Sequence, residues 1–102
     1  MMSNPEVRHI NLSQLGDYIA NDWDTGRGTT RVRNLTREMY GKDDDTFKNI
    51  EQSVAQHGIK EPLFVTHEGE NKYLIDGHRR AVLAMEYGID NIPVTSDWRN
   101  TE

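Results

Sequence analysis

The spacing of apolar and polar residues in the first half of the chain predicts short elements joined by polar segments. Residues 7–10 are typical of a strand, and residues 11–19 predict a brief helix with a polar cap. Residues 21–30 are rich in Asn, Asp, Thr and Gly, which predicts a loop. Residues 31–40 are expected to form one or two helical turns that end at Gly41.

A longer helix is predicted next, behind the acidic run Asp43-Asp44-Asp45. Its apolar positions recur at helical spacing, and they are Phe47, Ile50, Val54 and His57. Carboxylates at a helix start accept hydrogen bonds from free N–H groups and favour the positive end of the dipole. The alternative, a calcium loop, lacks the Gly and the terminal Glu at the required spacing. We expect the helix to end at Gly58 in the left-handed conformation, with Pro62 preventing its continuation.

The second half of the chain predicts two strands, a helix and a final strand. The apolar runs 63–65 and 73–75 are joined by a polar turn that contains Gly, which predicts a hairpin. A helix over residues 81–87 should stop at Gly88, and residues 89–94 should form a last edge strand. The pattern therefore predicts an α+β domain, with a short mixed sheet packed by helices.

Length and composition narrow the class of protein. With 102 residues, we expect a single small domain over residues 1–102, ending in a tail from residue 96. The absence of Cys excludes a disulfide framework, a cysteine zinc site and a thiol nucleophile. No window has the roughly 18 apolar residues needed to span a bilayer, and the start does not resemble a signal peptide. We therefore expect a cytoplasmic protein without a membrane partner.

The positive charge is concentrated, although the formal net charge is -5. Half of the Lys and Arg residues lie in two short stretches, namely Arg27, Arg31, Arg33 and Arg37, and the adjacent Arg79 and Arg80. Like charges held close together repel each other unless an anion or carboxylates lie between them. The first stretch therefore predicts a contact with nucleic acid or a protein partner. The alternative is a solvated arm balanced by nearby carboxylates.

The second stretch lies where a predicted strand turns through Gly77 into a helix. Free backbone N–H groups and the helix dipole make such a start an anion site. His78-Arg79-Arg80 adds cations there, although cations oppose the dipole, and such a broken local rule often marks a functional site. One guanidinium group can donate hydrogen bonds to two phosphate oxygens at once, so phosphate is the expected ligand. The alternative is that the arginines pair with Asp76, Glu86 or Asp90.

Two motifs in this order resemble the ParB/sulfiredoxin superfamily. The first is Gly58-Ile59-Lys60-Glu61-Pro62, which ends a helix and precedes an apolar strand, and the second is Gly77-His78-Arg79-Arg80. The helix, Gly and strand of residues 81–94 are also similar to the family pattern. The resemblance covers about residues 45–95 well and residues 1–44 only weakly.

The resemblance implies nucleotide binding, with the phosphates held at the second motif. The residues that it assigns to the nucleotide are Gly58, Ile59, Pro62, Gly77, His78, Arg79 and Arg80. Sulfiredoxin chemistry requires a Cys that is absent. ParB proper has Glu in place of His78 and uses CTP to close a DNA clamp, which also needs DNA-reading and dimerisation domains that 102 residues do not hold.

A third branch of the superfamily, the free-serine kinases, has a phosphate motif similar to residues 76–80. The resemblance implies Glu61 and Asp76 as catalytic residues, with Asp76 also holding Mg²⁺ against the nucleotide phosphates. One carboxylate can accept a hydroxyl proton while the other binds the metal. Alternatively, Glu61 is an ordinary surface residue and Asp76 a helix cap.

Three functions follow from these observations. The first is a stand-alone domain that binds a nucleoside diphosphate or triphosphate and acts as an accessory or regulatory protein in DNA transactions, with or without direct DNA binding. The second is a phosphotransferase or nucleotide hydrolase that uses Glu61 and Asp76. The third is a non-catalytic module that binds another protein through residues 27–37. The base, any hydrolysis and the oligomeric state are left open by the sequence.

Overall fold

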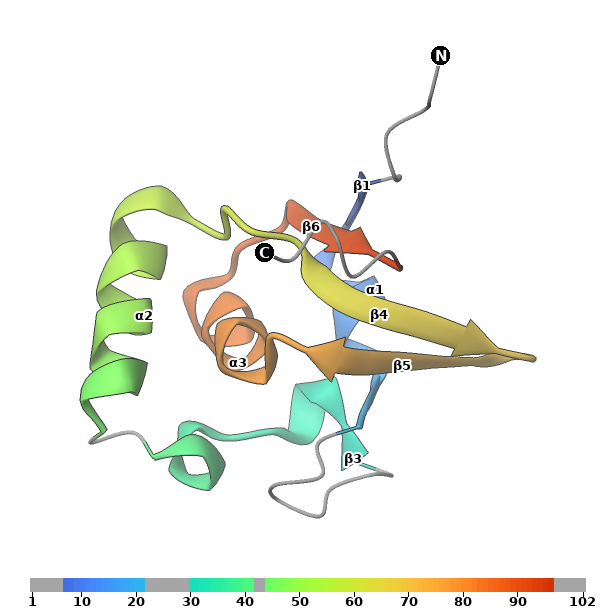
Figure 1. Cartoon of the computed structure of the whole chain (residues 1–102), viewed down its shortest axis with the longest axis horizontal. Helices are drawn as coiled ribbons and strands as arrows, with labels where there is room; N and C mark the ends of the chain where they lie inside the picture. Colours follow the sequence, from blue (N-terminus) through green and yellow to red (C-terminus); the bar gives the residue numbers. More distant parts are fainter. Residues whose placement is uncertain (1–6, 22–29, 42–43, 97–102) are drawn as a thin grey trace.

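The computed structural model describes residues 7–21, 30–41 and 44–96, which form a mixed sheet with helices (Figure 1). In the described residues the sheet has six strands, in the order β1 (Val7–Ile10), β6 (Ile92–Thr95), β4 (Leu63–Glu68), β5 (Asn71–Asp76), β2 (Ile19–Ala20) and β3 (Thr30–Arg31). The pairs β4–β6 and β2–β5 are parallel and the other pairs are antiparallel. This is the small α+β fold with a mixed sheet that the sequence predicts.

Two of the helices are stacked one outside the other on one side of the sheet (Figure 1). The described helical segments are α1 (Leu12–Gly16), η1 (Val32–Asn34), η2 (Arg37–Tyr40), α2 (Asp45–His57) and α3 (His78–Tyr87), of which η1 and η2 are 3₁₀ turns. In Figure 1, α3 lies next to the sheet and α2 lies outside it. The principal packing partner of α2 is accordingly α3, whereas α3 also contacts α1, η1, η2 and β4. No helix in the described ranges is long and apolar enough to cross a membrane.

The start of α2 follows from its sequence. The Asp44 carboxylate accepts a hydrogen bond from the Thr46 N–H at 2.7 Å, which confirms the predicted acidic cap for this residue; Asp43 lies outside the described residues. Phe47 and Val54 are buried, but His57 is exposed instead of joining the apolar face.

Gly41 ends the helical segment before α2, Gly58 ends α2 itself, and the two glycines differ in conformation. Gly58 has φ 73° and ψ -160°, so the expected left-handed cap is wrong in its ψ angle. The extended ψ directs the chain away from α2 toward β4. Gly41, by contrast, ends η2 at the predicted position and has the left-handed conformation.

The predicted first helix is too long. The structure ends α1 at Gly16, and Ile19–Ala20 instead forms β2, parallel to β5. Tyr18 and Ala20 are buried at alternate positions, as in a strand, whereas Leu15, Tyr18 and Ile19 recur at helical spacing, so this short run is compatible with either element. The strand follows from partners far along the chain, which local spacing does not reveal.

The last strand also differs from the prediction, because β6 is not an edge strand. It lies between β1 and β4, and both Ile92 and Val94 are fully buried. The β1 strand is the edge instead, pairing antiparallel with β6 in the register Val7↔Thr95. The predicted hairpin is confirmed, with strands that extend to Glu68 and from Asn71, so the turn is tighter than expected.

Candidate functional site

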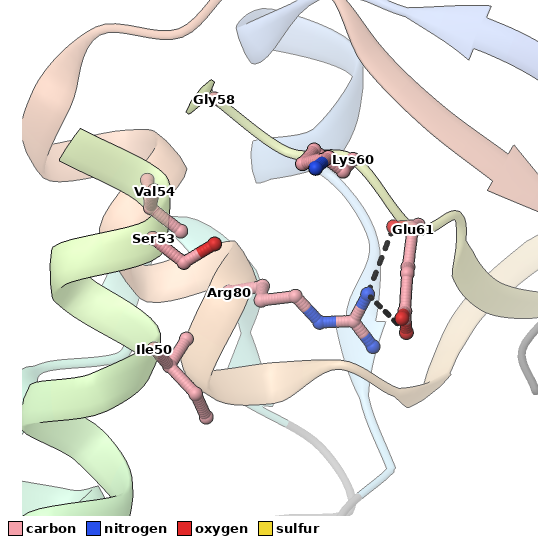
Figure 2. A pocket seen from close by; sticks show the side chains of 7 residues that line it. All are labelled: Ile50, Ser53, Val54, Gly58, Lys60, Glu61 and Arg80. Carbon is pink, nitrogen blue, oxygen red and sulfur yellow. Dashed lines mark hydrogen bonds and ion pairs between the residues drawn. The ribbon is translucent and has the colours of Figure 1, made fainter. Parts of the chain in front are cut away.

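A groove of about 490 Å³ lies where the two sequence motifs meet. Figure 2 shows the side chains that line it, which come from α2, from the segment before β4 and from α3, and these residues are Ile50, Ser53, Val54, Gly58, Lys60, Glu61 and Arg80. Sequence reasoning assigned Ile50 and Val54 to the core and did not single out Ser53 or Lys60 for the site. Helical spacing alone puts Ile50, Ser53 and Val54 on one side of α2, and this was the available signal.

Arg80 joins the second motif to the first. Its Nη1 donates a hydrogen bond to the backbone oxygen of Glu61 at 2.8 Å and lies 3.9 Å from the Glu61 carboxylate oxygen Oε2 (Figure 2). The Arg80 side chain is 20% exposed, whereas that of Glu61 is 65% exposed. The backbone contact therefore fixes the arginine in the groove wall, and the carboxylate remains accessible to solvent.

The turn into α3 requires Gly77. This residue has φ 100°, and a Cβ there would lie 2.6 Å from Cδ2 of the fully buried Leu63. The Asp76 Oδ1 accepts a hydrogen bond from the Gly77 N–H at 2.9 Å, and within the described part of the chain no side chain caps α3 itself. Asp76 therefore stabilises the turn before the helix and does not cap the N–H groups of the first helical turn.

Arg79 is a half-buried cation whose Nε is fully buried and has no hydrogen-bond partner in residues 7–21, 30–41 and 44–96. The alternative that nearby carboxylates neutralise it is not supported, because those carboxylates bind elsewhere in the described chain. Asp76 binds Gly77, Glu86 binds Arg37, and Asp90 accepts a hydrogen bond from the Leu12 N–H. The arginine thus lies beside an uncapped helix start without an anionic partner among the described residues.

The other residues assigned to the nucleotide lie mostly in the core. The His78 ring is directed inward, with Nε2 3.1 Å from the Leu74 oxygen and with its plane stacked on Tyr40 at 6.0 Å between centroids. Ile59 is buried in the core and Pro62 is half-buried. His78 therefore places its backbone, not its imidazole, at the helix start.

The first arginine stretch does not form one surface. Arg31 donates to the Asp17 backbone oxygen at 2.5 Å, and Arg33 forms an ion pair with the Asp17 carboxylate. Arg37 instead binds two carboxylates between α2 and α3. Arg27 lies outside the described residues. Spacing along the sequence placed these arginines together, and the fold separates Arg37 from Arg31 and Arg33.

The carboxylates that were predicted to act in catalysis have different surroundings. Glu61 lines the groove, while Asp76 does not and uses Oδ1 for the turn. Within residues 7–21, 30–41 and 44–96, no group of three His, Asp or Glu side chains is arranged to hold a metal ion. A magnesium ion near Asp76 would therefore depend on oxygen ligands from a bound phosphate and from water.

The mixed sheet, the strand–glycine–helix turn and the groove beside Arg80 define a small α+β domain. Comparison with protein families agrees with this arrangement. The family model described as the ParB N-terminal domain matches residues 29–100, and the chain belongs to this family. No curated protein and no solved structure matches the chain.

Proposed function

We propose that the protein binds a nucleoside diphosphate or triphosphate, with its phosphates at the start of α3, and acts as an accessory or regulatory protein in DNA transactions. The observation that carries the proposal is Arg79, whose buried Nε has no acceptor among the described residues. Leaving a buried donor without a partner costs about 1–3 kcal/mol, and more when the group is charged. An anion at the helix start would supply the missing acceptor.

The surroundings of Arg79 favour phosphate as that anion. The first turn of α3 has backbone N–H groups that no side chain of the described residues caps, and the helix dipole adds partial positive charge. Arg80 contributes a second guanidinium on the groove side of the same turn. The groove volume of about 490 Å³ is within the range of small-molecule sites, so a nucleoside attached to the phosphates has room beside Ile50, Ser53 and Val54.

The test is ligand-dependent stabilisation of the folded protein. Thermal unfolding is followed with CTP, ATP, ADP and GTP in the presence of Mg²⁺, and a ligand at 100 times its Kd should add about 2.7 kcal/mol to the unfolding free energy. We expect stabilisation by at least one nucleotide and its loss in Arg79→Ala. Arg33→Ala is the matched control, because it removes an arginine that is paired with Asp17 outside the groove. If none of the four nucleotides stabilises the protein, the proposal is wrong.

A second candidate function is phosphoryl transfer or nucleotide hydrolysis. It is favoured by the exposed carboxylate of Glu61, which lines the groove 3.9 Å from Arg80 and is therefore accessible to a hydroxyl group or a water molecule. Asp76 is the proposed holder of Mg²⁺, together with phosphate oxygens. Release or transfer of phosphate should fall in Glu61→Gln while nucleotide binding persists. Equal rates for the variant and the parent protein would contradict the role of Glu61.

A module that binds another protein through residues 27–37 has less support. Arg31, Arg33 and Arg37 all contact groups of this chain, so a partner would have to displace these contacts. Capture of a partner that is lost in Arg31→Ala and Arg33→Ala, without any effect of nucleotide, would favour this function. DNA binding by the same arginines would show a steep fall in affinity with salt.

A further inference from the structure

Arg37 connects the two helices that form opposite sides of the groove. Its Nη2 donates hydrogen bonds to Glu51 of α2 at 2.8 Å and to Glu86 of α3 at 2.5 Å. Its Nε also lies 3.1 and 3.2 Å from the two oxygens of Glu86. The guanidinium lies 5.5 Å from the centre of the Phe47 ring of α2. We call Arg37, Glu51 and Glu86 the Arg37 bridge.

The bridge is partly shielded from solvent and has a fourth participant. The side chains of Arg37, Glu51 and Glu86 are 28%, 25% and 37% exposed. The Tyr87 hydroxyl donates a hydrogen bond to Glu51 at 2.9 Å, so Glu51 accepts from two elements. The hydrogen bond from Arg37 lowers the pKa of Glu51 most, and the hydrogen bond from Tyr87 lowers it further. The hydrogen bonds that Arg37 donates, first to Glu86 and second to Glu51, raise the pKa of Arg37. Both groups therefore stay charged at neutral pH.

The remaining attachment of α2 is narrow. Of its 13 residues, Phe47 and Val54 are buried and Ile50 packs partly buried against the core, and the principal packing partner of the helix is α3. Glu51 immediately follows Ile50 and precedes Ser53 by two positions, and both of these residues line the groove. Because side chains on one helix turn as a unit, a contact that fixes Glu51 also fixes the direction of Ile50 and Ser53.

We propose that Arg37 is a positioning residue for the groove: by joining Glu51 of α2 to Glu86 of α3, it sets the separation and rotation of the helices that line the groove. The inference rests on the proposed nucleotide binding at this groove. Arg37 does not line the groove, so its effect on a ligand is exerted through α2. Loss of the bridge would let α2 rotate about its narrow apolar contact, and Ile50, Ser53 and Arg80 would no longer be held in register.

The test compares nucleotide affinity in variants that remove one side of the bridge. Kd values for CTP, ATP, ADP and GTP with Mg²⁺ are measured by titration calorimetry at a temperature where circular dichroism shows every variant to be folded. We expect Arg37→Gln and Glu51→Gln each to weaken binding about threefold to tenfold, and the double variant to bind no more weakly than either single variant, because both remove the same link. Arg37→Lys, which keeps one charged donor, should be intermediate. Arg33→Gln is the matched control and should leave Kd unchanged.

Amide hydrogen exchange of the ligand-free protein separates positioning from general loss of stability. Exchange in residues 45–57 should accelerate in Arg37→Gln and Glu51→Gln, while exchange in β4 and β5 stays as in the parent protein. Binding by both variants with the parent Kd overturns this inference alone. Acceleration throughout the sheet also overturns it, because weaker binding would then report overall unfolding. Absence of binding by the parent protein overturns the proposed function, and the inference with it.

Discussion

Replacing Gly77 by Ala should destabilise the protein through two separable effects. The backbone has φ 100°, and an L-residue in a left-handed conformation costs about 1–2 kcal/mol. The new Cβ would also lie 2.6 Å from Cδ2 of Leu63, which is fully buried. Overpacking of this kind costs typically about 1–3 kcal/mol. The expected sum is a loss of about 2–5 kcal/mol in the free energy of unfolding.

Gly69→Ala provides the matched control, because Gly69 has φ 62° and nothing lies within 4 Å of its added Cβ. This variant carries the backbone effect alone, so it should lose only about 1–2 kcal/mol. Urea unfolding gives both free energies, and the contact with Leu63 should lower the melting temperature of Gly77→Ala by roughly a further 4–12 °C. Leu63→Val in the Gly77→Ala background should recover part of the difference. Equal stability of the two Ala variants would refute the steric argument.

Two other predictions concern pH and the start of α2. His67 is exposed, and partial desolvation, followed by the positive charges of Arg8 and Lys72, lowers its pKa below the ordinary 6.5. Because the unfolded chain takes up the proton first, the free energy of unfolding should fall as pH is lowered through 6.5. Urea titrations between pH 7.5 and 5 should show this slope reduced in His67→Gln, and an unchanged slope would contradict the assignment. Asp44→Ala removes the acceptor for the Thr46 N–H and should lower stability by about 0.5–2 kcal/mol, whereas Asp44→Asn keeps the acceptor and should lose less; equal losses in thermal unfolding would exclude a capping role.

Elements defined by local chemistry could be predicted from the sequence. The cap at Asp44, the hairpin of β4 and β5, and the glycines that end η2 and α3 each depend on residues within a few positions of one another. The order of strands could not be predicted in the same way. The central place of β6 depends on pairing with Val7–Ile10, more than 80 residues away.

The candidate site shows the same limit at the level of single side chains. The resemblance assigned residues of both motifs to one nucleotide site, and the structure places Gly58 and Glu61 of the first motif and Arg80 of the second around one groove. They did not predict that the His78 ring stacks on Tyr40 or that Arg37 binds Glu51. Those side chains meet residues from other elements, and a motif does not specify the direction in which such a side chain points.

Three arginines around α3 show why the partners of a charge matter more than the net charge. The guanidinium of Arg37 binds two carboxylates, so it contributes little attraction for a further anion. Arg80 donates to a backbone oxygen and has a carboxylate only at 3.9 Å, which leaves part of its charge uncompensated. Arg79 has neither kind of partner among the described residues. Among the described residues, uncompensated positive charge therefore increases from Arg37 through Arg80 to Arg79, so the proposed anion would be attracted most by the two arginines of the first turn of α3.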